Sequence, residues 1–162
     1  MRGLALFAAG VVFGTVLMQT SAAQENRNTG FRLNHVGIAV KDLQESVDFY
    51  TKVMGFHVAY PLPNPSGNPT TIFLQINRDT FLEVAQSNAN VPVGLTHMGI
   101  WSEDANATVA QLRQVGATVA DPRPGGPSGS RLVNITDPNG IRVEVNEQPT
   151  GSLMRKAMDA WK

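Results

Sequence analysis

The chain has 162 residues, of which 42% are hydrophobic, and it contains no cysteine. This size and composition suit one compact domain and exclude a disordered chain, while the missing cysteines exclude disulfides, thiol catalysis and thiolate metal ligands. The 13 basic residues balance 13 acidic ones, and no basic stretch is interleaved with aromatic residues, so a nucleic acid is not expected as a partner.

Residues 1–23 have the pattern of a secretory signal peptide. Arg2 precedes an apolar run from Leu4 to Met18, and small residues up to Ala23 suit cleavage after that position. The apolar run is shorter than the roughly 20 residues of a membrane-spanning helix, and an uncleaved anchor is the alternative. We therefore expect a secreted or periplasmic protein that leaves the membrane after signal removal and starts with a polar lead-in at residues 24–31.

The first half of the mature chain predicts a strand, a helix and three further strands. Residues Arg32–Val40 alternate with period two, which places His35 opposite the β-branched stripe. Asp42 and Glu45 form a capping box for a helix that runs to Met54 and ends at Gly55. The three later strands are expected at Phe56–Tyr60, Thr71–Ile76 and Phe81–Ala85.

The second half predicts the same βαβββ order. Its first strand is expected at Leu95–Trp101, and its helix begins after Asp104, runs through Val115 and ends at Gly116. The later strands are expected at Thr118–Asp121, Leu132–Thr136 and Ile141–Asn146. In each half a Pro- and Gly-rich segment, residues 61–69 or 122–130, forms either a lid or an ordinary hairpin connection. The tail at 148–162 predicts a helix that packs on the sheet or on a partner subunit, with membrane-surface or peptide binding as the alternative.

The chain also repeats itself in sequence, because Leu33–Ile38 returns as Leu95–Ile100, 62 positions later. His35 therefore recurs as His97, and each half ends in a strand that carries a glutamate, Glu83 or Glu144. Two imidazoles and two carboxylates at a shared seam would bind a divalent metal ion, and a structural network of His–Glu hydrogen bonds is the alternative. His57 has no counterpart in the second half and is interpreted as an ordinary strand residue.

These motifs resemble the vicinal oxygen chelate superfamily, the glyoxalase, bleomycin-resistance and extradiol-dioxygenase group, and the likeness is greatest to glyoxalase-I-like metalloenzymes. The resemblance implies an α+β fold in which two tandem βαβββ modules, at about 32–86 and 95–147, form a cupped, partly open, eight-stranded mixed sheet, followed by the C-terminal helix. The resemblance covers residues 32–147, and its marks are Asn34–Leu43, Asp48–Tyr50, Met54–Phe56, Asp137–Gly140 and Glu144.

The resemblance also implies roles for site residues. In the family, one divalent ion is bound from the first and last strands of each module, which correspond here to His35, Glu83, His97 and Glu144. By resemblance to glyoxalase I, Glu144 is the carboxylate that leaves the metal to act as base, and Glu83 stays a ligand or serves the opposite face of the substrate. Strand alternation adds four residues on the same face that contact substrate or form its wall: Trp101, Asn134, Arg142 and Gln75.

The function implied is that of a lyase or isomerase acting through an enediolate on a small molecule with two adjacent oxygens, a 2-oxoaldehyde adduct or a hydroxycarbonyl compound. The alternatives are an Fe- or Mn-dependent dioxygenase or thiol transferase, which needs only His35, His97 and Glu144, and a non-catalytic binder of a drug or metabolite. Ni, Co, Zn, Fe and Mn all suit this donor set. Family resemblance favours a homodimer.

Overall fold

The structure, a computed structural model, describes residues 30–162, so the signal peptide expected at 1–23 lies outside the described residues. Residues Arg32–Lys162 form one compact unit. Its elements are β1 (Arg32–Val40), α2 (Leu43–Asp48), the π-helix η1 (Phe49–Val53), β2 (His57–Pro61), β3 (Thr71–Asn77), β4 (Thr80–Gln86), β5 (Gly94–Trp101), α3 (Ala105–Gln114), β6 (Arg123–Pro124), the 3₁₀ helix η2 (Gly126–Ser128), β7 (Arg131–Thr136), β8 (Arg142–Glu147) and α4 (Leu153–Ala160).

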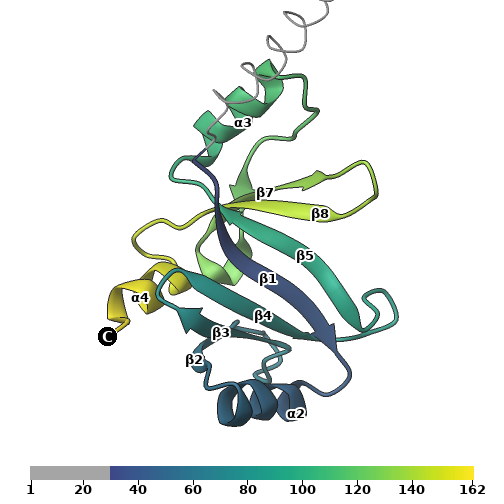
Figure 1. The fold of residues 1–162 in the computed structure, drawn as a ribbon, viewed down its shortest axis with the longest axis vertical. Helices are drawn as coiled ribbons and strands as arrows, with labels where there is room; N and C mark the ends of the chain where they lie inside the picture. Colours follow the sequence, from purple (N-terminus) through teal and green to yellow (C-terminus); the bar gives the residue numbers. More distant parts are fainter. Residues whose placement is uncertain (1–29) are drawn as a thin grey trace, which may run out of the picture. The chain divides into compact units, whose positions relative to one another are not determined.

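All eight strands form a single mixed sheet in the order β2-β3-β4-β1-β5-β8-β7-β6. The first strands of the two halves, β1 and β5, lie antiparallel at its centre (Figure 1). Each of them also pairs in parallel with the glutamate strand of its own half, β1 with β4 and β5 with β8. The predicted α+β fold of two βαβββ modules is therefore confirmed, and the two modules join within one chain.

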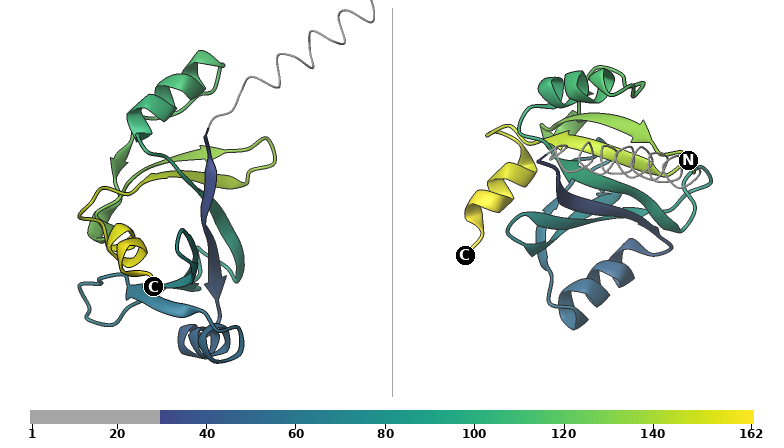
Figure 2. Two further views of the ribbon diagram at one scale, coloured as in Figure 1. Left: turned by 60° about the vertical axis from the view of Figure 1, so that its left-hand side comes forward. Right: turned by 45° about the horizontal axis from the view of Figure 1, so that its top comes forward.

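Residues at alternate positions of a strand point to opposite faces of the sheet, and here both faces carry apolar side chains. The inner face is the one that α4 covers, and the outer face is the other. Helices α2 and α3 pack on the outer face through Val47 and Val109. Helix α4 packs on the inner face, where Met154 and Met158 contact an aromatic cluster of Tyr60, Phe73, Phe81 and Trp101. In Figure 2, α4, the yellow helix at the C-terminus, lies apart from both α2 and α3. The packing role predicted for the tail is confirmed.

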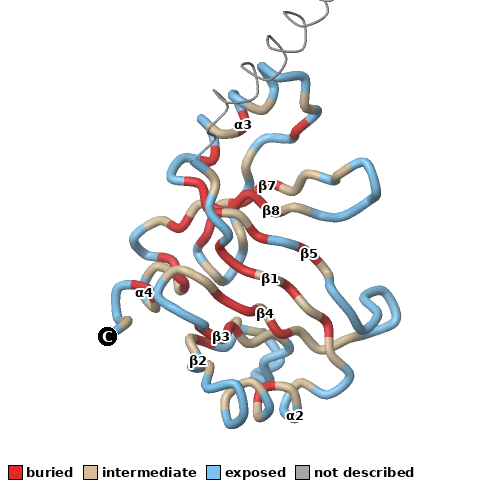
Figure 3. Tube along the Cα trace, viewed as in Figure 1, coloured by how far each residue is buried: buried red, intermediate tan, exposed pale blue. Residues whose placement is uncertain are grey.

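Burial is greatest where the four central strands cross the unit, as the red segments of β1, β4, β5 and β8 show in Figure 3. His35 and His97 are 1% and 2% exposed, so both imidazoles lie in the interior of the sheet's inner face. Within residues 30–162, no helix combines the length and the apolar character that a membrane crossing requires.

Two elements differ from the sequence predictions. The helix predicted to continue to Met54 is α-helical only to Asp48 and then widens into η1. The prediction of a strand at Thr118–Asp121 is wrong. Only the two residues of β6, which follow that segment, pair with β7. The physical reason is that Arg113 donates two hydrogen bonds to the Val119 carbonyl, which takes that backbone group away from a sheet.

Candidate metal centre

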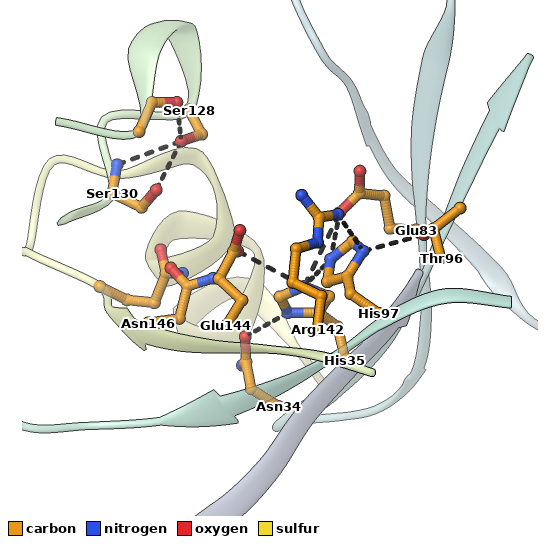
Figure 4. Close-up of polar contacts among 12 residues, drawn as sticks. Asn34, His35, Glu83, Thr96, His97, Ser128, Ser130, Arg142, Glu144 and Asn146 are labelled. Atoms are coloured by element: carbon orange, nitrogen blue, oxygen red, sulfur yellow. Dashed lines mark hydrogen bonds and ion pairs between the residues drawn. The ribbon is translucent and has the colours of Figure 1, made fainter. Parts of the chain in front are cut away.

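The four predicted ligands converge on the inner face from four neighbouring strands. His35 and His97 lie nearest to each other, with 2.9 Å between their Nε2 atoms. Oε2 of Glu83 lies 3.3 Å from Nε2 of His97 and 3.7 Å from Nε2 of His35. Oε1 of Glu144 lies 3.7 Å from Nε2 of His35. Figure 4 shows these side chains pointing toward one another.

Two glycines make this approach possible. In the antiparallel β1–β5 ladder, His35 lies opposite Gly99 and His97 lies opposite Gly37. A Cβ atom on Gly99 would overlap the His35 ring, and one on Gly37 would overlap the His97 ring. Each imidazole therefore occupies space that the glycine of the other module leaves open. The repeated His-x-Gly triplet is the sequence form of this arrangement.

The donor set fits a divalent ion. Ligand atoms bound at about 2.1 Å on neighbouring corners of an octahedron or a tetrahedron lie roughly 3.0–3.4 Å apart. The Nε2 atoms of His35 and His97 and Oε2 of Glu83 are separated by 2.9–3.7 Å, close to that spacing. These three residues form a compact cluster, and Glu144 borders it on the His35 side.

His35 is oriented for a ligand at Nε2. Its Nδ1 lies 2.9 Å from Oδ1 of Asn34, and because that oxygen only accepts, the Nδ1–H of His35 donates to it. The proton on Nδ1 leaves the Nε2 lone pair free to face the cluster. A second hydrogen bond of this kind fixes the tautomer and ring direction of metal-binding histidines.

His97 has a different partner at Nδ1. A guanidinium nitrogen of Arg142 lies 2.7 Å from this atom, and Oγ1 of Thr96 lies 2.9 Å from it. Arginine can only donate, so Nδ1 of His97 accepts and the neutral ring carries its proton on Nε2, 2.9 Å from Nε2 of His35 and 3.3 Å from Oε2 of Glu83. A metal ion at Nε2 requires the opposite tautomer, with Nδ1–H donating to Thr96 and Arg142 moved aside. Arg142 therefore opposes metal binding, both through this hydrogen bond and through its charge.

Replacing Arg142 with methionine is expected to strengthen binding of a divalent ion by roughly tenfold, about 1.4 kcal/mol. The variant removes both the cation and the donor that holds His97 in the wrong tautomer. Isothermal titration with Zn²⁺ measures the change. Arg78→Met is the matched control, because Arg78 is an exposed residue that pairs with Asp79 and not with His97. Equal affinities for wild type and Arg142→Met would contradict the role assigned to Arg142.

Burial and charge shift the titration of the cluster. Burial lowers the pKa of His35 from 6.5 to about 4, with the Glu83 carboxylate opposing the shift. Burial acts to raise the pKa of Glu83, but the hydrogen bond from His97 and the charges of both histidines and Arg142 outweigh it, so that pKa is lowered. Burial raises the pKa of Glu144 despite attraction to His97. The lowered pKa values of His35 and Glu83 favour a neutral imidazole and a carboxylate, the protonation states that metal ligands need.

The His35 shift makes the metal-free protein sensitive to acid. In the unfolded chain His35 binds a proton near pH 6.5, whereas in the folded protein it does so only near pH 4. The free energy of unfolding is therefore at its full value above pH 6.5 and decreases as the pH falls from 6.5 to 4. The expected loss is about 3 kcal/mol. Urea unfolding in EDTA at several pH values measures it.

The control is His35→Gln, whose stability should change less steeply over the same pH range. Glu144, with its raised pKa, acts in the opposite direction in part of this range, but it is present in both proteins, so their difference isolates His35. Equal slopes in the two proteins would contradict the assignment.

The four other predicted site residues separate into two pairs. Arg142 bonds His97, and Asn134 lies on β7 opposite Glu144, so both border the cluster. Trp101 is 5% exposed and packs in the aromatic cluster under α4. Gln75 bonds the Arg78 and Ala157 carbonyls, away from the four ligands. The alternation of residues along each strand correctly predicted the face of the sheet on which these side chains lie. It did not predict how far each one lies from the four ligands.

Sequence analysis missed the residues that support the histidines. Asn34 and Thr96 each precede a histidine by one position and bond its Nδ1, and Gly37 and Gly99 each follow one by two positions. All four belong to the same repeated segment, so the repeat itself was the signal that could have identified them. No sequence pattern of this kind identified the other polar side chains near the cluster, the amides of Asn146 and Gln148 and the hydroxyls of Ser128 and Ser130.

Comparison with known proteins identifies the family. The sequence model of the Glyoxalase/Bleomycin resistance protein/Dioxygenase superfamily matches residues 32–145. The chain belongs to this superfamily. The match begins at the start of β1 and extends into β8, so it includes all four strands that carry the cluster.

Named relatives within the superfamily catalyse different reactions. The chain is 30% identical over 127 residues to a lactoylglutathione lyase of Escherichia coli O157:H7, covering 72% of this chain and 93% of the relative. It is 28% identical over 131 residues to a mitochondrial methylmalonyl-CoA epimerase of Dictyostelium discoideum, covering 72% and 78% of the two chains. A solved Streptomyces coelicolor methylmalonyl-CoA epimerase, in complex with 2-nitronate-propionyl-CoA, superposes with a TM-score of 0.62 at 26% identity and covers 75% of this chain and 96% of its own.

Proposed function

We propose that this protein is an exported, metal-dependent lyase or isomerase of glyoxalase type. Its substrate is a small molecule with a hydroxyl and a carbonyl on adjacent carbons, and the reaction moves a proton from one of these carbons to the other. The observation that carries the proposal is the convergence of two histidines and two glutamates on the inner face of one sheet. The composition of residues 1–23 supports export, and family resemblance supports a homodimer.

His35, His97 and Glu83 would hold the ion, which is Ni, Co, Zn, Fe or Mn, and Glu144 lies beside them as a further ligand or a base. When bound, such an ion supplies Lewis-acid polarisation of the substrate's two oxygens. The Glu144 carboxylate takes the proton from the carbon that bears the hydroxyl and returns it to the neighbouring carbon. The hydroxyl proton moves to the former carbonyl oxygen, so the product is an isomer of the substrate.

Metal content together with activity tests this proposal. We expect close to one divalent ion per chain in protein purified without chelators, and loss of that ion in a Glu83→Ala/His97→Ala double variant. The loaded protein should convert the hemithioacetal of methylglyoxal and glutathione or incorporate deuterium from D₂O into a hydroxycarbonyl compound, and EDTA should stop both. A wild-type protein that binds none of the five ions after reconstitution would overturn the proposal and favour a binding protein.

The compact cluster supports a second candidate function. Two histidines and Glu83 make a two-histidine, one-carboxylate triad, which is the donor set of non-haem Fe(II) oxygenases. The sequence predicted Glu144 in this triad. Both glutamates lie 3.7 Å from Nε2 of His35, but Glu83 also lies 3.3 Å from Nε2 of His97. Iron as the bound element, with oxygen consumption on addition of a catechol, would favour a dioxygenase over an isomerase.

A further inference from the structure

A small cavity with a mixed polar and apolar wall adjoins the candidate metal centre on the inner face, and Leu62, Phe73, Leu132 and Met154 form its apolar part. Its volume is about 120 Å³, and Glu83 and Glu144 form part of its wall. Figure 4 shows Ser128 and Ser130 on the far side of Glu144 and Asn146 from the histidines. The cavity is therefore continuous with the carboxylates that would bind the metal and the substrate, but neither histidine lines it.

A ladder of amides that starts on β8 and continues just past its end leads from Glu144 into this cavity. Asn146 donates from Nδ2 to Oε1 of Glu144, and Gln148 donates from Nε2 to Oδ1 of Asn146 over 2.9 Å. These bonds fix Gln148 with its Oε1 free. That oxygen finds no donor within residues 30–162, although the residue is only 6% exposed. A buried acceptor of this kind is stabilised by a ligand that donates a hydrogen bond.

The opposite wall of the cavity supplies hydroxyl groups. Ser128 donates to the Gly125 carbonyl over 3.0 Å, and Oγ of Ser130 lies 2.7 Å from Oγ of Ser128. A Cβ at Gly125 would overlap Oγ of Ser130, so a larger residue there would displace this hydroxyl. The phenol of Tyr60 also borders the cavity, and burial raises its pKa, so it remains a donor. Hydroxyls that both donate and accept suit a ligand that carries hydroxyls itself.

Charge and volume limit what this cavity can take. Among the residues that line it, only the two glutamates carry a charge, and no lysine, arginine or histidine is present. The two glutamates would already balance the charge of a divalent ion, so a carboxylate or phosphate in the cavity would find no further positive group on its wall. A cavity of about 150 Å³ holds benzene, with its six non-hydrogen atoms, so about five such atoms fit in this smaller space.

We propose that this cavity is the subsite for the hydroxylated end of a small, uncharged hydroxycarbonyl substrate of three or four carbons. The inference rests on the proposed function, and it names the substrate class for that site. Gln148 accepts a hydrogen bond from the terminal hydroxyl, and Tyr60 donates one to the oxygen of that hydroxyl. The reacting carbons then lie next to Glu144.

The subsite is tested by incubating the Co²⁺-loaded protein with a substrate probe in D₂O. NMR then measures the rate at which the probe incorporates deuterium. Dihydroxyacetone is the neutral probe, and dihydroxyacetone phosphate is the matched charged probe. We expect kcat/KM for dihydroxyacetone to exceed that for its phosphate by at least tenfold. Gln148→Leu should raise KM for dihydroxyacetone by about tenfold, with a smaller change in kcat. Gln44→Leu is the control, because Gln44 is an exposed residue of α2 that bonds Asp48.

The outcomes separate the subsite from the function. Turnover of the phosphate or of the glutathione hemithioacetal in preference to dihydroxyacetone, with no effect of Gln148→Leu, would overturn the subsite and leave the isomerase proposal standing. No exchange with any of the three compounds in metal-loaded protein would overturn both. If Gln148→Leu does not fold, Tyr60→Phe replaces it, and an unchanged KM in that variant would overturn the subsite.

Discussion

Replacing Glu144 with glutamine is expected to lower kcat by roughly 10²- to 10⁴-fold, the range for loss of a general base. Glutamine keeps the shape of the side chain and its hydrogen bond with Asn146, but it cannot accept a proton from carbon. His35, His97 and Glu83 form the compact cluster without Glu144, so metal binding should persist in this variant. Deuterium exchange from D₂O and elemental analysis on the same sample measure the two properties.

The matched comparison is Glu83→Gln, a substitution of the same kind on the neighbouring glutamate strand. Because Oε2 of Glu83 is within 3.7 Å of Nε2 in both histidines, this variant should lose metal as well as activity. A wild-type kcat in Glu144→Gln would exclude Glu144 as the base. Loss of metal in both variants would instead make Glu144 an essential ligand.

Replacing Gly99 with alanine is expected to weaken divalent-ion affinity at least a hundredfold. The added Cβ would overlap the His35 ring, which is 1% exposed and bonded to Asn34, so the ring has no free space into which to move. Overpacking of this kind also destabilises a protein by about 1–3 kcal/mol. Isothermal titration with Zn²⁺ and urea unfolding of the metal-free protein measure the two effects.

Gly151→Ala is the control for this experiment. A Cβ at Gly151 would meet no atom within 4 Å, so affinity and stability should stay near the wild-type values. Gly37→Ala tests the symmetric contact, since its Cβ would overlap the His97 ring instead. Wild-type affinity in Gly99→Ala would mean that His35 is not held where the structure places it.

The repeat made most of the fold and the ligand cluster predictable from sequence. Two copies of one segment imply two modules, and alternation within each strand gave the face of every ligand. That information does not specify position along a strand, which is why Gln75 and Trp101 share the inner face but lie away from the cluster. The prediction of a strand at Thr118–Asp121 failed because the Arg113 side chain, six residues before Val119, bonds the Val119 carbonyl and competes with sheet pairing, and strand alternation does not reveal such a contact.

The cavity beyond Glu144 was unpredictable for a different reason. Ser128 and Ser130 belong to a Pro- and Gly-rich segment with no periodicity, and α4 reaches this wall from the far end of the chain, through Met154. A pattern within one element cannot indicate that such distant segments meet. Asn146 lies in β8 and Gln148 directly follows that strand, but their hydrogen-bonded ladder depends on the conformations of both amide side chains, which the sequence does not give.

Each module constrains the sequence of the other, because His35 faces Gly99 and His97 faces Gly37. A larger residue at either glycine position becomes tolerable only after the facing imidazole has been lost from the other module. Substitutions at these positions should therefore be non-additive across the modules, and each module limits which sequences the other can explore. Gene duplication would have supplied two copies of the segment, but this interlocking would have kept them from diverging independently.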